Sequence, residues 1–407
     1  MWGVRRAATK HSACTAKEAI PTSDRFTLGP ATLAIGDGSS TYGRLVVANG
    51  RISEVLPADG PSDFYLPAGT TIAPGLIELH THGAGEFLFN RDQGYAVPVA
   101  AVEYARQGAT AFVACIMTAP WESMLHAAGE VVEAAHQLEE DEPRGARCLG
   151  IHFEGPFLNP KFRRVHRAEW IIPASAERAR AMVDACKGAC LMVTLAPEID
   201  GAGEAARVFL EHGCVCSAGH TGARYREGML AIGMGYRSLT HAFNAMLPLD
   251  HREPSILAAF IQDTRTMVQL ICDGHHVAPV MVDILHRTIG DRLILATDLM
   301  PPAGPGYRVE GGVMRSEDGT IAGSAVKMDQ SLRNYMTYTE ISFAKAIAAV
   351  THAPSKLLGY ESDLGRIAKG LRADLSFWND DYHVIGTMVG GTMVHGDCVS
   401  PVAAAAS

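Results

Sequence analysis

Two histidines separated by one residue, His80 and His82, end an apolar segment of this sequence. Alternate residues of a β-strand point to the same face, so both imidazoles would project to one side at the end of the strand. Imidazole is a common metal ligand, and two converging rings suit one metal ion. The alternative is a strand end with two ordinary histidines, because the pattern also arises by chance.

Ionisable residues also end other apolar segments. Glu154, His220 and His241 each follow such a segment. Asp298 follows the last one, and another segment ends in Asp273, His275 and His276. Ionisable groups are rarely buried without partners. Their repetition at one end of successive strands therefore predicts a shared site, and a metal centre explains it best.

The segments that carry these residues are eight apolar stretches of β type, separated mostly by amphipathic helical stretches. Residues 121–140 have apolar positions at helical spacing, and residues 175–187 open with Ser175 as an N-cap. Strands that are apolar on both faces and alternate with helices predict a parallel sheet, and eight such units predict a closed TIM-like (β/α)8 barrel. The strands are expected within 71–83, 109–118, 147–157, 190–198, 214–222, 238–246, 266–276 and 292–302. In such a barrel the active site lies at the carboxyl ends of the strands.

Both ends of the chain have a different texture, rich in glycine and β-forming residues. Asn49-Gly50 lies between two apolar runs and predicts a hairpin turn. We expect residues 26–73 and 364–400 to form one small β-sandwich domain, because the termini of a domain often lie close together. The barrel then spans 74–363, and residues 1–25 form a loose N-terminal arm, with a transit peptide as the alternative.

Composition excludes several classes of protein. The 407 residues are 47% hydrophobic and 19% charged, with a formal net charge of -9 and no block of lysine or arginine. Nucleic acids and anionic membranes are therefore not expected partners. The nine cysteines are scattered and form no C-x-x-C pair, which favours reduced residues in a cytoplasmic protein. The N-terminus lacks the apolar core of a secretory signal, and no stretch is long enough to span a bilayer.

A set of motifs between Ile72 and His395 resembles the amidohydrolase superfamily and, within it, the N-acetylglucosamine-6-phosphate deacetylase family. These motifs are PGLIELHTHG, HFEGPF, LAPE, AGHT, THAFNAM, HREP, CDGHHV, ATDLMPPAG and AGSAVKMDQ. Their order and spacing carry the resemblance, since no single motif is decisive. The resemblance implies a barrel that carries a β-sandwich built from both ends of the chain. It also implies metal-dependent removal of an acetyl group from N-acetyl-D-glucosamine 6-phosphate.

The resemblance implies a metal site as well. In the family a glutamate and two histidines hold the main metal, which here correspond to Glu154, His220 and His241. Three protein ligands and a water molecule are typical of an open catalytic zinc site. Some members bind a second ion with the H-x-H pair, so His80 and His82 imply a binuclear site in which Glu154 bridges the ions. A mononuclear site merely lined by this pair remains the alternative.

The family's catalytic and substrate-binding residues also have counterparts. Asp298 corresponds to the general base that later returns the proton to the leaving amine, and His166 to a histidine that polarises the amide carbonyl. Arg252 matches a phosphate-binding arginine supplied by the neighbouring subunit, which implies a homodimer. The remaining substrate contacts implied by the resemblance are Val165, Asn244, Ala245, His276, Ile321, Ala322 and Gly323.

Some positions depart from the family pattern and leave other hypotheses open. Arg164-Val165 stands where the family usually has Gly-Ala, and the surrounding loop is unusually basic. The substrate could therefore be another N-acetylated amino sugar, such as N-acetylgalactosamine 6-phosphate. The segment TLAPE lacks the bridging lysine of dihydroorotase-like sites, and deaminase-like sites lack the glutamate at position 154. A non-catalytic assembly protein on the same scaffold is the remote alternative, because such proteins normally lose the metal ligands retained here.

Overall fold

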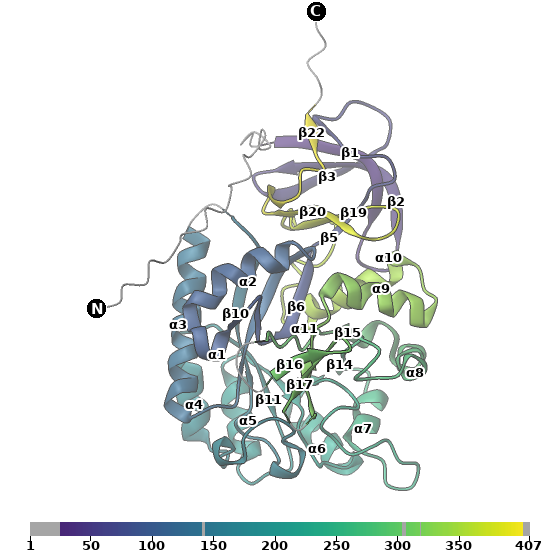
Figure 1. Ribbon diagram of the computed structural model, residues 1–407. Coiled ribbons are helices and arrows are strands. Elements are labelled where there is room, and N and C mark those ends of the chain that lie inside the picture. The colour runs from purple at the N-terminus through teal and green to yellow at the C-terminus, as the bar shows by residue number, and fades with distance from the viewer. Residues whose placement is uncertain (1–24, 141–142, 303–306, 318, 402–407) are drawn as a thin grey trace, which may run out of the picture.

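The computed structural model describes residues 25–140, 143–302, 307–317 and 319–401. Two bodies of secondary structure stand out in Figure 1, a barrel with surrounding helices and a mainly antiparallel sheet that lies above it. The predicted arm, residues 1–25, lies outside the described residues except for Arg25, which begins strand β1.

The barrel sheet contains eight parallel strands, and their spatial order follows the chain. The end of the first strand meets the residues after the last through a parallel bridge between Thr81 and Leu299, which links the two edges. Each strand falls within one of the eight predicted segments, so the barrel prediction is confirmed. The strands are β6 (Leu76–Thr81), β9 (Ala109–Met117), β10 (Arg147–Glu154), β11 (Cys190–Leu195), β12 (Val215–Ala218), β13 (Ser238–Leu239), β14 (Met267–Leu270) and β15 (Leu293–Leu295).

Helices cover the outside of the barrel, and both helical stretches predicted from the sequence are present. The helix expected at 121–140 is α3 (Trp121–Glu140), and Ser175 caps α4 by accepting a hydrogen bond from the Arg178 amide at 3.2 Å. The buried residues of α3 recur at helical spacing, which explains its attachment to the sheet. The other helices are α1 (Phe89–Asp92), α2 (Ala96–Ala105), α4 (Ala176–Ala185), α5 (Ala202–Glu211), α6 (Tyr225–Met234), α7 (Ile256–Gln262), α8 (Pro279–Ile289), α9 (Met328–Thr339), α10 (Phe343–Ala346) and α11 (His352–Leu357).

The second sheet joins the two ends of the chain, as predicted. Its main path runs β21-β20-β19-β5-β1-β2-β3, and the N- and C-terminal segments meet where β5 and β19 pair antiparallel. Its own apolar cluster includes Leu28, Leu45 and Phe377. The strands are β1 (Arg25–Ala34), β2 (Ser40–Ala48), β3 (Arg51–Pro57), β4 (Phe64–Tyr65), β5 (Thr71–Pro74), β19 (Leu375–Trp378), β20 (Val384–Val389), β21 (Thr392–His395) and β22 (Ser400–Pro401).

Local features of this sheet agree with the turn chemistry. Asn49 and Gly50 connect β2 to β3 with φ angles of 51° and 71°, as a two-residue hairpin turn requires. The segment 71–83, expected as one strand, is divided at Gly75 between β5 and barrel strand β6. A side chain at Gly75 would bring its Cβ to 2.0 Å from Thr110 Oγ1, so only glycine fits this crossing.

Small sheets complete the barrel mouth. Strands β16 (Tyr307–Glu310), β17 (Val313–Ser316) and β18 (Ile321–Ser324) form an antiparallel sheet after β15, and β7 (Gly83–Ala84) pairs with β8 (Phe87–Leu88) after β6. A parallel bridge from Ser324 to Leu299 attaches β18 to the end of the barrel. The predicted substrate segment 321–323 therefore lies beside the carboxyl ends of the strands.

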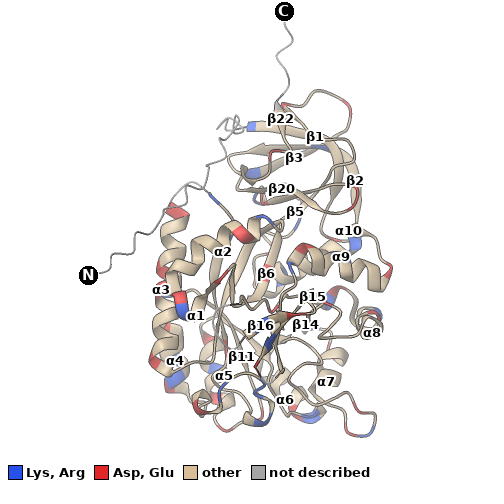
Figure 2. Ribbon diagram, viewed as in Figure 1, with Lys and Arg blue, Asp and Glu red and all other residues tan. Residues whose placement is uncertain are grey.

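Charged residues do not gather on one element. Figure 2 marks acidic and basic residues along the ribbon, and both kinds occur on the outer helices and the upper sheet. Within the described part of the chain, no helix is long and apolar enough to cross a membrane.

Candidate metal centre and substrate cavity

The ends of the barrel strands bring the predicted site residues together. His80 lies in β6 and His82 directly after it, while Glu154 is the last residue of β10. His220 and His241 each stand two residues beyond a short strand, β12 and β13. A regular strand points successive side chains to opposite faces. The direction of the His220 and His241 side chains therefore depends on the irregular backbone where the chain leaves the sheet.

That irregular backbone is visible in the dihedral angles. His220, His241 and Asp298 have φ angles of 47°, 31° and 50°, in a region that non-glycine residues seldom adopt. Such conformations cluster at functional sites, where the surrounding structure holds them in place. Three predicted site residues therefore carry a conformational cost that aims their side chains into the barrel mouth.

Glu154, His220 and His241 form a compact triangle of ligand atoms. Glu154 Oε1 lies 3.1 Å from His220 Nε2 and 3.3 Å from His241 Nε2, and the two nitrogens are 3.1 Å apart. Ligand atoms about 2.0 Å from a tetrahedral zinc ion are about 3.3 Å from one another. The triangle therefore has the dimensions of one face of a metal coordination tetrahedron.

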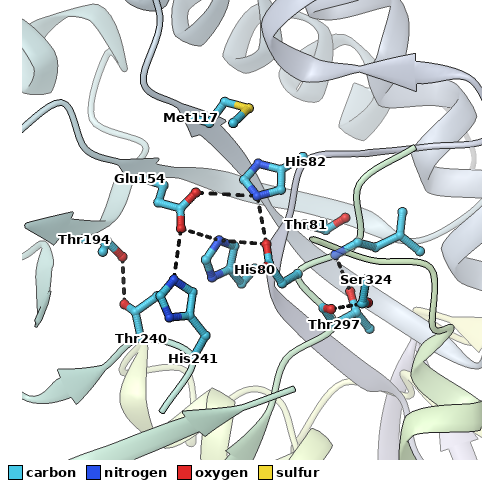
Figure 3. Close-up of polar contacts among 12 residues, drawn as sticks. His80, Thr81, His82, Met117, Glu154, Thr194, Thr240, His241, Thr297 and Ser324 are labelled. Atoms are coloured by element: carbon cyan, nitrogen blue, oxygen red, sulfur yellow. Dashed lines mark hydrogen bonds and ion pairs between the residues drawn. The ribbon is translucent and has the colours of Figure 1, made fainter. Parts of the chain in front are cut away.

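His80 and His82 also contact this glutamate, and Figure 3 shows both rings beside its carboxylate together with His241. His80 Nε2 is 3.4 Å from Glu154 Oε1, and His82 Nε2 is 3.6 Å from Oε2. Asp298 Oδ1 lies 3.0 Å from His82 Nε2 and 3.6 Å from His80 Nε2. Glu154 therefore contacts both histidine pairs, with Oε1 near His80, His220 and His241 and Oε2 near His82.

Unsatisfied buried atoms indicate that this cluster fits a cation. Among the described residues, neither ring nitrogen of His80 has a hydrogen-bond partner, although its side chain is fully buried. The same residues offer no hydrogen-bond partner to the buried Nδ1 atoms of His82, His166 and His241. Buried polar groups normally have partners, and metal coordination would satisfy the inward-facing nitrogen of His80.

The electrostatics agree with a cation site. Burial would lower the pKa of His82, yet the negative charges of Cys115, Asp298 and Glu154 raise it to about 10. The pKa of His80 is also raised well above its ordinary value, against the effect of burial, by the same three groups. The surrounding groups thus stabilise a positive charge at these two rings. A divalent ion bound to neutral imidazoles would supply that charge.

Hydrogen bonds outside the cluster fix the rings. His220 Nδ1 donates to the carbonyl of Phe162 at 2.9 Å, which leaves Nε2 free to act as a ligand. His152, on β10 with Glu154, donates from Nδ1 to the carbonyl of Leu79 at 3.1 Å, and its Nε2 lies 2.8 Å from Thr194 Oγ1. The bond to Phe162 thus orients His220, and the two contacts of His152 fix a ring that packs against His80.

Sequence reasoning missed two members of this interior. His152 was overlooked although the two-residue spacing in His152-Phe153-Glu154 places it on the face of Glu154. In the sequence Cys115 resembles any buried cysteine of an apolar strand, but its Sγ lies within 4.8 Å of ligand atoms of His80, His82 and Glu154. Burial would raise the pKa of Cys115, whereas the charges of His152, His80 and His82 hold it well below its ordinary value.

His166, predicted to polarise the substrate carbonyl, lies directly beside two of the predicted metal ligands, Glu154 and His220. Its Nε2 is 3.5 Å from Glu154 Oε2, and its ring centroid is 4.6 Å from that of His220. Ligand atoms of Glu154, His166 and His220 all lie within 4.8 Å of one another. The geometry is therefore compatible with contact to substrate or to a metal ion.

A cavity of about 360 Å³ opens directly above these residues. Asp298, His82, Glu154, His220 and His241 contribute to its wall. The predicted substrate residues that also line it are Val165, His166, Asn244, Ala245, His276, Ile321, Ala322 and Gly323. Its volume is typical of small-molecule sites, and its floor is the candidate metal cluster.

The predicted residues differ in how they meet the cavity. His276 is fixed by Asp273, whose Oδ2 lies 2.6 Å from His276 Nδ1 and whose Oδ1 accepts hydrogen bonds from two backbone amides. Arg164, which the sequence marked as a departure, lines the cavity with φ of 51°. Arg252 is exposed and is not among the described residues that line the cavity of its own chain.

Comparison with known proteins identifies the family to which this chain belongs. The sequence profile of the amidohydrolase family matches residues 71–394, which include all the residues of the candidate metal cluster. The chain belongs to the amidohydrolase family. This membership implies a divalent metal ion, in agreement with the buried histidine and carboxylate cluster.

Individual relatives of this amidohydrolase are similar over most of their length. It is 30% identical to N-acetylglucosamine-6-phosphate deacetylase from Vibrio furnissii over 365 residues, which cover 87% of this chain and 90% of that protein. It is 29% identical to N-acetylgalactosamine-6-phosphate deacetylase from Escherichia coli O157:H7 over 351 residues, covering 84% and 92% respectively.

A solved structure shows the same fold. The amidohydrolase superposes with a TM-score of 0.85 on a mutant N-acetyl-D-glucosamine-6-phosphate deacetylase from Mycobacterium smegmatis in complex with N-acetyl-D-glucosamine-6-phosphate. The two sequences are 30% identical, and the match covers 92% of this chain and 100% of the other. The similarity therefore includes the barrel and most of the second sheet.

Proposed function

We propose that this amidohydrolase removes the acetyl group of N-acetyl-D-glucosamine 6-phosphate, giving D-glucosamine 6-phosphate and acetate. One observation carries the proposal. The triangle formed by Glu154, His220 and His241 lies at the floor of a cavity that also presents Asp298. Metal-assisted amide hydrolysis needs ligands that hold a cation and a separate group that can transfer a proton, and this cavity offers both.

We propose zinc as the metal, with Glu154, His220 and His241 as its protein ligands. A second ion would be held by His80 and His82, with Glu154 as the bridge. A divalent ion in this position lowers the pKa of water and polarises an amide carbonyl. The ligand types, imidazole and carboxylate, are those that zinc prefers at catalytic sites.

Asp298 is proposed as the proton carrier. Burial would raise its pKa, but the charges of His80 and His82 lower it to about 2, so it is ionised at neutral pH. The carboxylate can accept a proton from water as the oxygen attacks the amide carbon. It then delivers that proton to the nitrogen as the carbon–nitrogen bond breaks, which completes the conversion of amide and water to amine and acetate.

His166 and the upper wall of the cavity are proposed to bind the substrate. His166 can donate a hydrogen bond to the carbonyl oxygen as negative charge develops there. The sugar would contact Val165, Asn244, Ala245 and His276 on one side and residues 321–323 of β18 on the other. Asp273 positions His276, since the carboxylate binds both its ring and its backbone amide.

We further propose a homodimer in the cytoplasm, in which Arg252 reaches the cavity of the neighbouring subunit and binds the phosphate. Asp250 fixes the loop by accepting hydrogen bonds from the amides of Arg252 and Glu253 at 2.7 and 2.9 Å. Exposed Leu249 lies on the same loop and suits a subunit contact. The eight described cysteines are free, which fits a reducing compartment.

N-acetylgalactosamine 6-phosphate is a second candidate substrate, because one relative of nearly equal identity acts on that epimer according to its name. Acetate release from a panel of N-acetylhexosamines, with and without the 6-phosphate, tests both candidates. The gluco epimer with phosphate is expected to have the highest kcat/KM, and activity should disappear after metal chelation. A lack of acetate release from every phosphorylated sugar, with metal bound, would contradict the proposal.

The two-ion site gives a stoichiometric prediction. Wild-type protein saturated with zinc should hold about two ions per chain, and His82→Ala about one, because the variant loses a ligand of the second ion only. Inductively coupled plasma mass spectrometry after gel filtration measures this ratio. His126→Ala, on the outer helix α3, is the control and should retain both ions. A wild-type ratio that saturates at one would favour the mononuclear alternative.

The phosphate contact gives a kinetic prediction. Arg252→Ala should raise KM for the phosphorylated sugar by about 10-fold or more and leave KM for the unphosphorylated sugar nearly unchanged, because only the former loses an ionic anchor. Arg265→Ala is the control, since Arg265 is exposed and pairs with Asp263. Equal effects on both sugars would assign Arg252 a structural role.

Mixing variants tests whether Arg252 acts between subunits. An Arg252→Ala chain retains Asp298, and an Asp298→Asn chain retains Arg252, so one cavity of each mixed dimer contains both groups. Random mixing in equal amounts should restore about one quarter of wild-type sites. If mixed dimers form but recover no activity beyond that of the separate variants, Arg252 does not act in trans.

A further inference from the structure

Cys115 lies between the two strands that provide the second-ion ligands. Its strand, β9, pairs in parallel with β6, which leads to His80 and His82, and with β10, which ends at Glu154. In the register with β10, Cys115 is opposite His152. In the described sheet, β9 is the strand that lies between β6 and β10, so an inward-facing side chain of β9 is placed to contact both groups.

The alternation along β9 turns Cys115 inward. Ala111 and Val113 share its face and pack in an apolar cluster with Ile77 of β6 and Ile294 of β15. Met117, the next residue on that face, lines the substrate cavity. Cys115 is completely buried one step below it, at the level of the histidine rings.

The donor atoms around this position form a possible four-ligand set. One ligand atom each from His80, His82, Cys115 and Glu154 lies within 4.8 Å of all the others. The His80 side chain is fully buried, and neither of its ring nitrogens has a hydrogen-bond partner among the described residues, which independently points to a ligand in this space. Two imidazoles, a thiolate and a carboxylate are donors that favour zinc or cobalt over magnesium or calcium.

We propose that Cys115 binds the second metal ion through its sulfur, together with His80, His82 and the bridging Glu154. This inference rests on the two-ion site proposed above. It adds a protein ligand that an assignment from the two histidines and the shared glutamate does not include. The thiol releases its proton when the sulfur binds the ion, as metal coordination of cysteine requires.

Four protein ligands make this second site closed. Structural zinc sites have four protein ligands, whereas catalytic sites have three and keep one position for water or substrate. His80 and Cys115 are absent from the described residues that line the cavity, whereas His82 and Glu154 line it together with His220 and His241. An ion held by all four second-site ligands would have no position left for water, whereas an ion held by Glu154, His220 and His241 would keep one.

Titration with cobalt(II) alone tests the proposal and needs no substrate. The full-length protein is stripped of metal with a chelator and titrated while the near-ultraviolet spectrum is recorded, because a thiolate bound to cobalt gives an intense charge-transfer band there. Wild-type protein should develop this band with the ion that fills the second site. Cys115→Ser should lose the band and bind that ion at least about 100-fold more weakly, since even ligand-orienting neighbours are worth 10- to 100-fold.

A matched variant separates the thiolate ligand from a general effect of cysteine loss. Cys148 is also buried, on the neighbouring strand β10, and its sulfur donates to the Gly150 carbonyl at 3.8 Å. Cys148→Ser should keep both the band and the affinity. Circular dichroism confirms that each variant is folded, and the wild-type spectrum decides whether any thiolate binds, even if Cys115→Ser fails to fold.

The outcomes distinguish this inference from the function on which it rests. Two bound cobalt ions without a charge-transfer band would overturn the role of Cys115 and leave the two-ion site intact. One bound ion without a band would overturn both. A band that persists in Cys115→Ser would assign the sulfur ligand to another residue. Acetate release is measured separately, so a protein that shows the band but hydrolyses no sugar contradicts the substrate assignment only.

Discussion

Replacing Asp298 with Asn is expected to lower kcat by about 10²- to 10⁴-fold, the usual contribution of a general base, while the metal content stays unchanged. The amide retains the size of the carboxylate and can still bond His82, which lies 3.0 Å from Asp298 Oδ1. It cannot accept the proton from water or return it to the amine. Because the left-handed backbone at Asp298 also tolerates asparagine, the fold should be preserved.

Two measurements keep this result specific. Steady-state kinetics should show KM changing much less than kcat, because Asp298 is proposed to act on the proton and not to bind the sugar. Asp291→Asn, an exposed carboxylate in the turn after α8, should leave both constants unchanged. Loss of bound metal from Asp298→Asn would instead make Asp298 a metal ligand, which its 3.6 Å distance to His80 Nε2 also allows.

The barrel could be predicted because its signal is spread along the chain. Eight apolar segments with intervening helices specify the fold even though single strand limits are inaccurate, and β13 has only two residues where nine were included in the predicted segment. The joint sheet was also predictable, since segments with the same texture occur at both ends. The domain limits at 73 and 363 remain predictions, and β5 continues to Pro74.

The candidate site was predictable where strand ends meet polar residues. Glu154 follows directly from the alternation along β10, but His220, His241 and Asp298 depend on positive φ angles that a sequence pattern does not reveal. These three residues could be identified from their residue types and their positions at the ends of strands. The directions of their side chains could not be predicted. The proposed role of each residue was carried by the family resemblance, and neither spacing nor composition could supply it.

The role proposed for Cys115 could not be predicted, because a sequence does not distinguish a cysteine of the apolar core from a metal-binding cysteine. Cysteine is among the most buried residues, so a cysteine within an apolar strand looks like part of the core. Only the parallel pairing of β9 with both β6 and β10 brings it beside the histidines. Arg252 presents a different difficulty. Its proposed role is in the cavity of the neighbouring subunit, so the structure of a single chain cannot show the group that it binds.

Replacing His220 is expected to have the largest effect on the proposed open metal site. His220→Ala should weaken the ion there by at least about 100-fold and reduce hydrolysis to background, since it removes one of three ligands and the cation that activates water. His220 has φ of 47°, so alanine adds backbone strain. His220→Asn tolerates that conformation better and removes the imidazole, which separates the loss of a ligand from the loss of a fold.

Metal analysis and calorimetric titration with zinc measure the loss, and circular dichroism with thermal unfolding monitors the fold. Both variants should retain the ion at His80 and His82, giving about one ion per chain under saturation, because that site keeps its own two imidazoles. His212→Ala is the control, since His212 lies at the end of outer helix α5 and bonds only the Val208 carbonyl through its ring among the described residues. Full zinc content and turnover in His220→Asn would show that His220 is not a ligand, because asparagine cannot replace an imidazole nitrogen whose position is fixed by the Phe162 carbonyl.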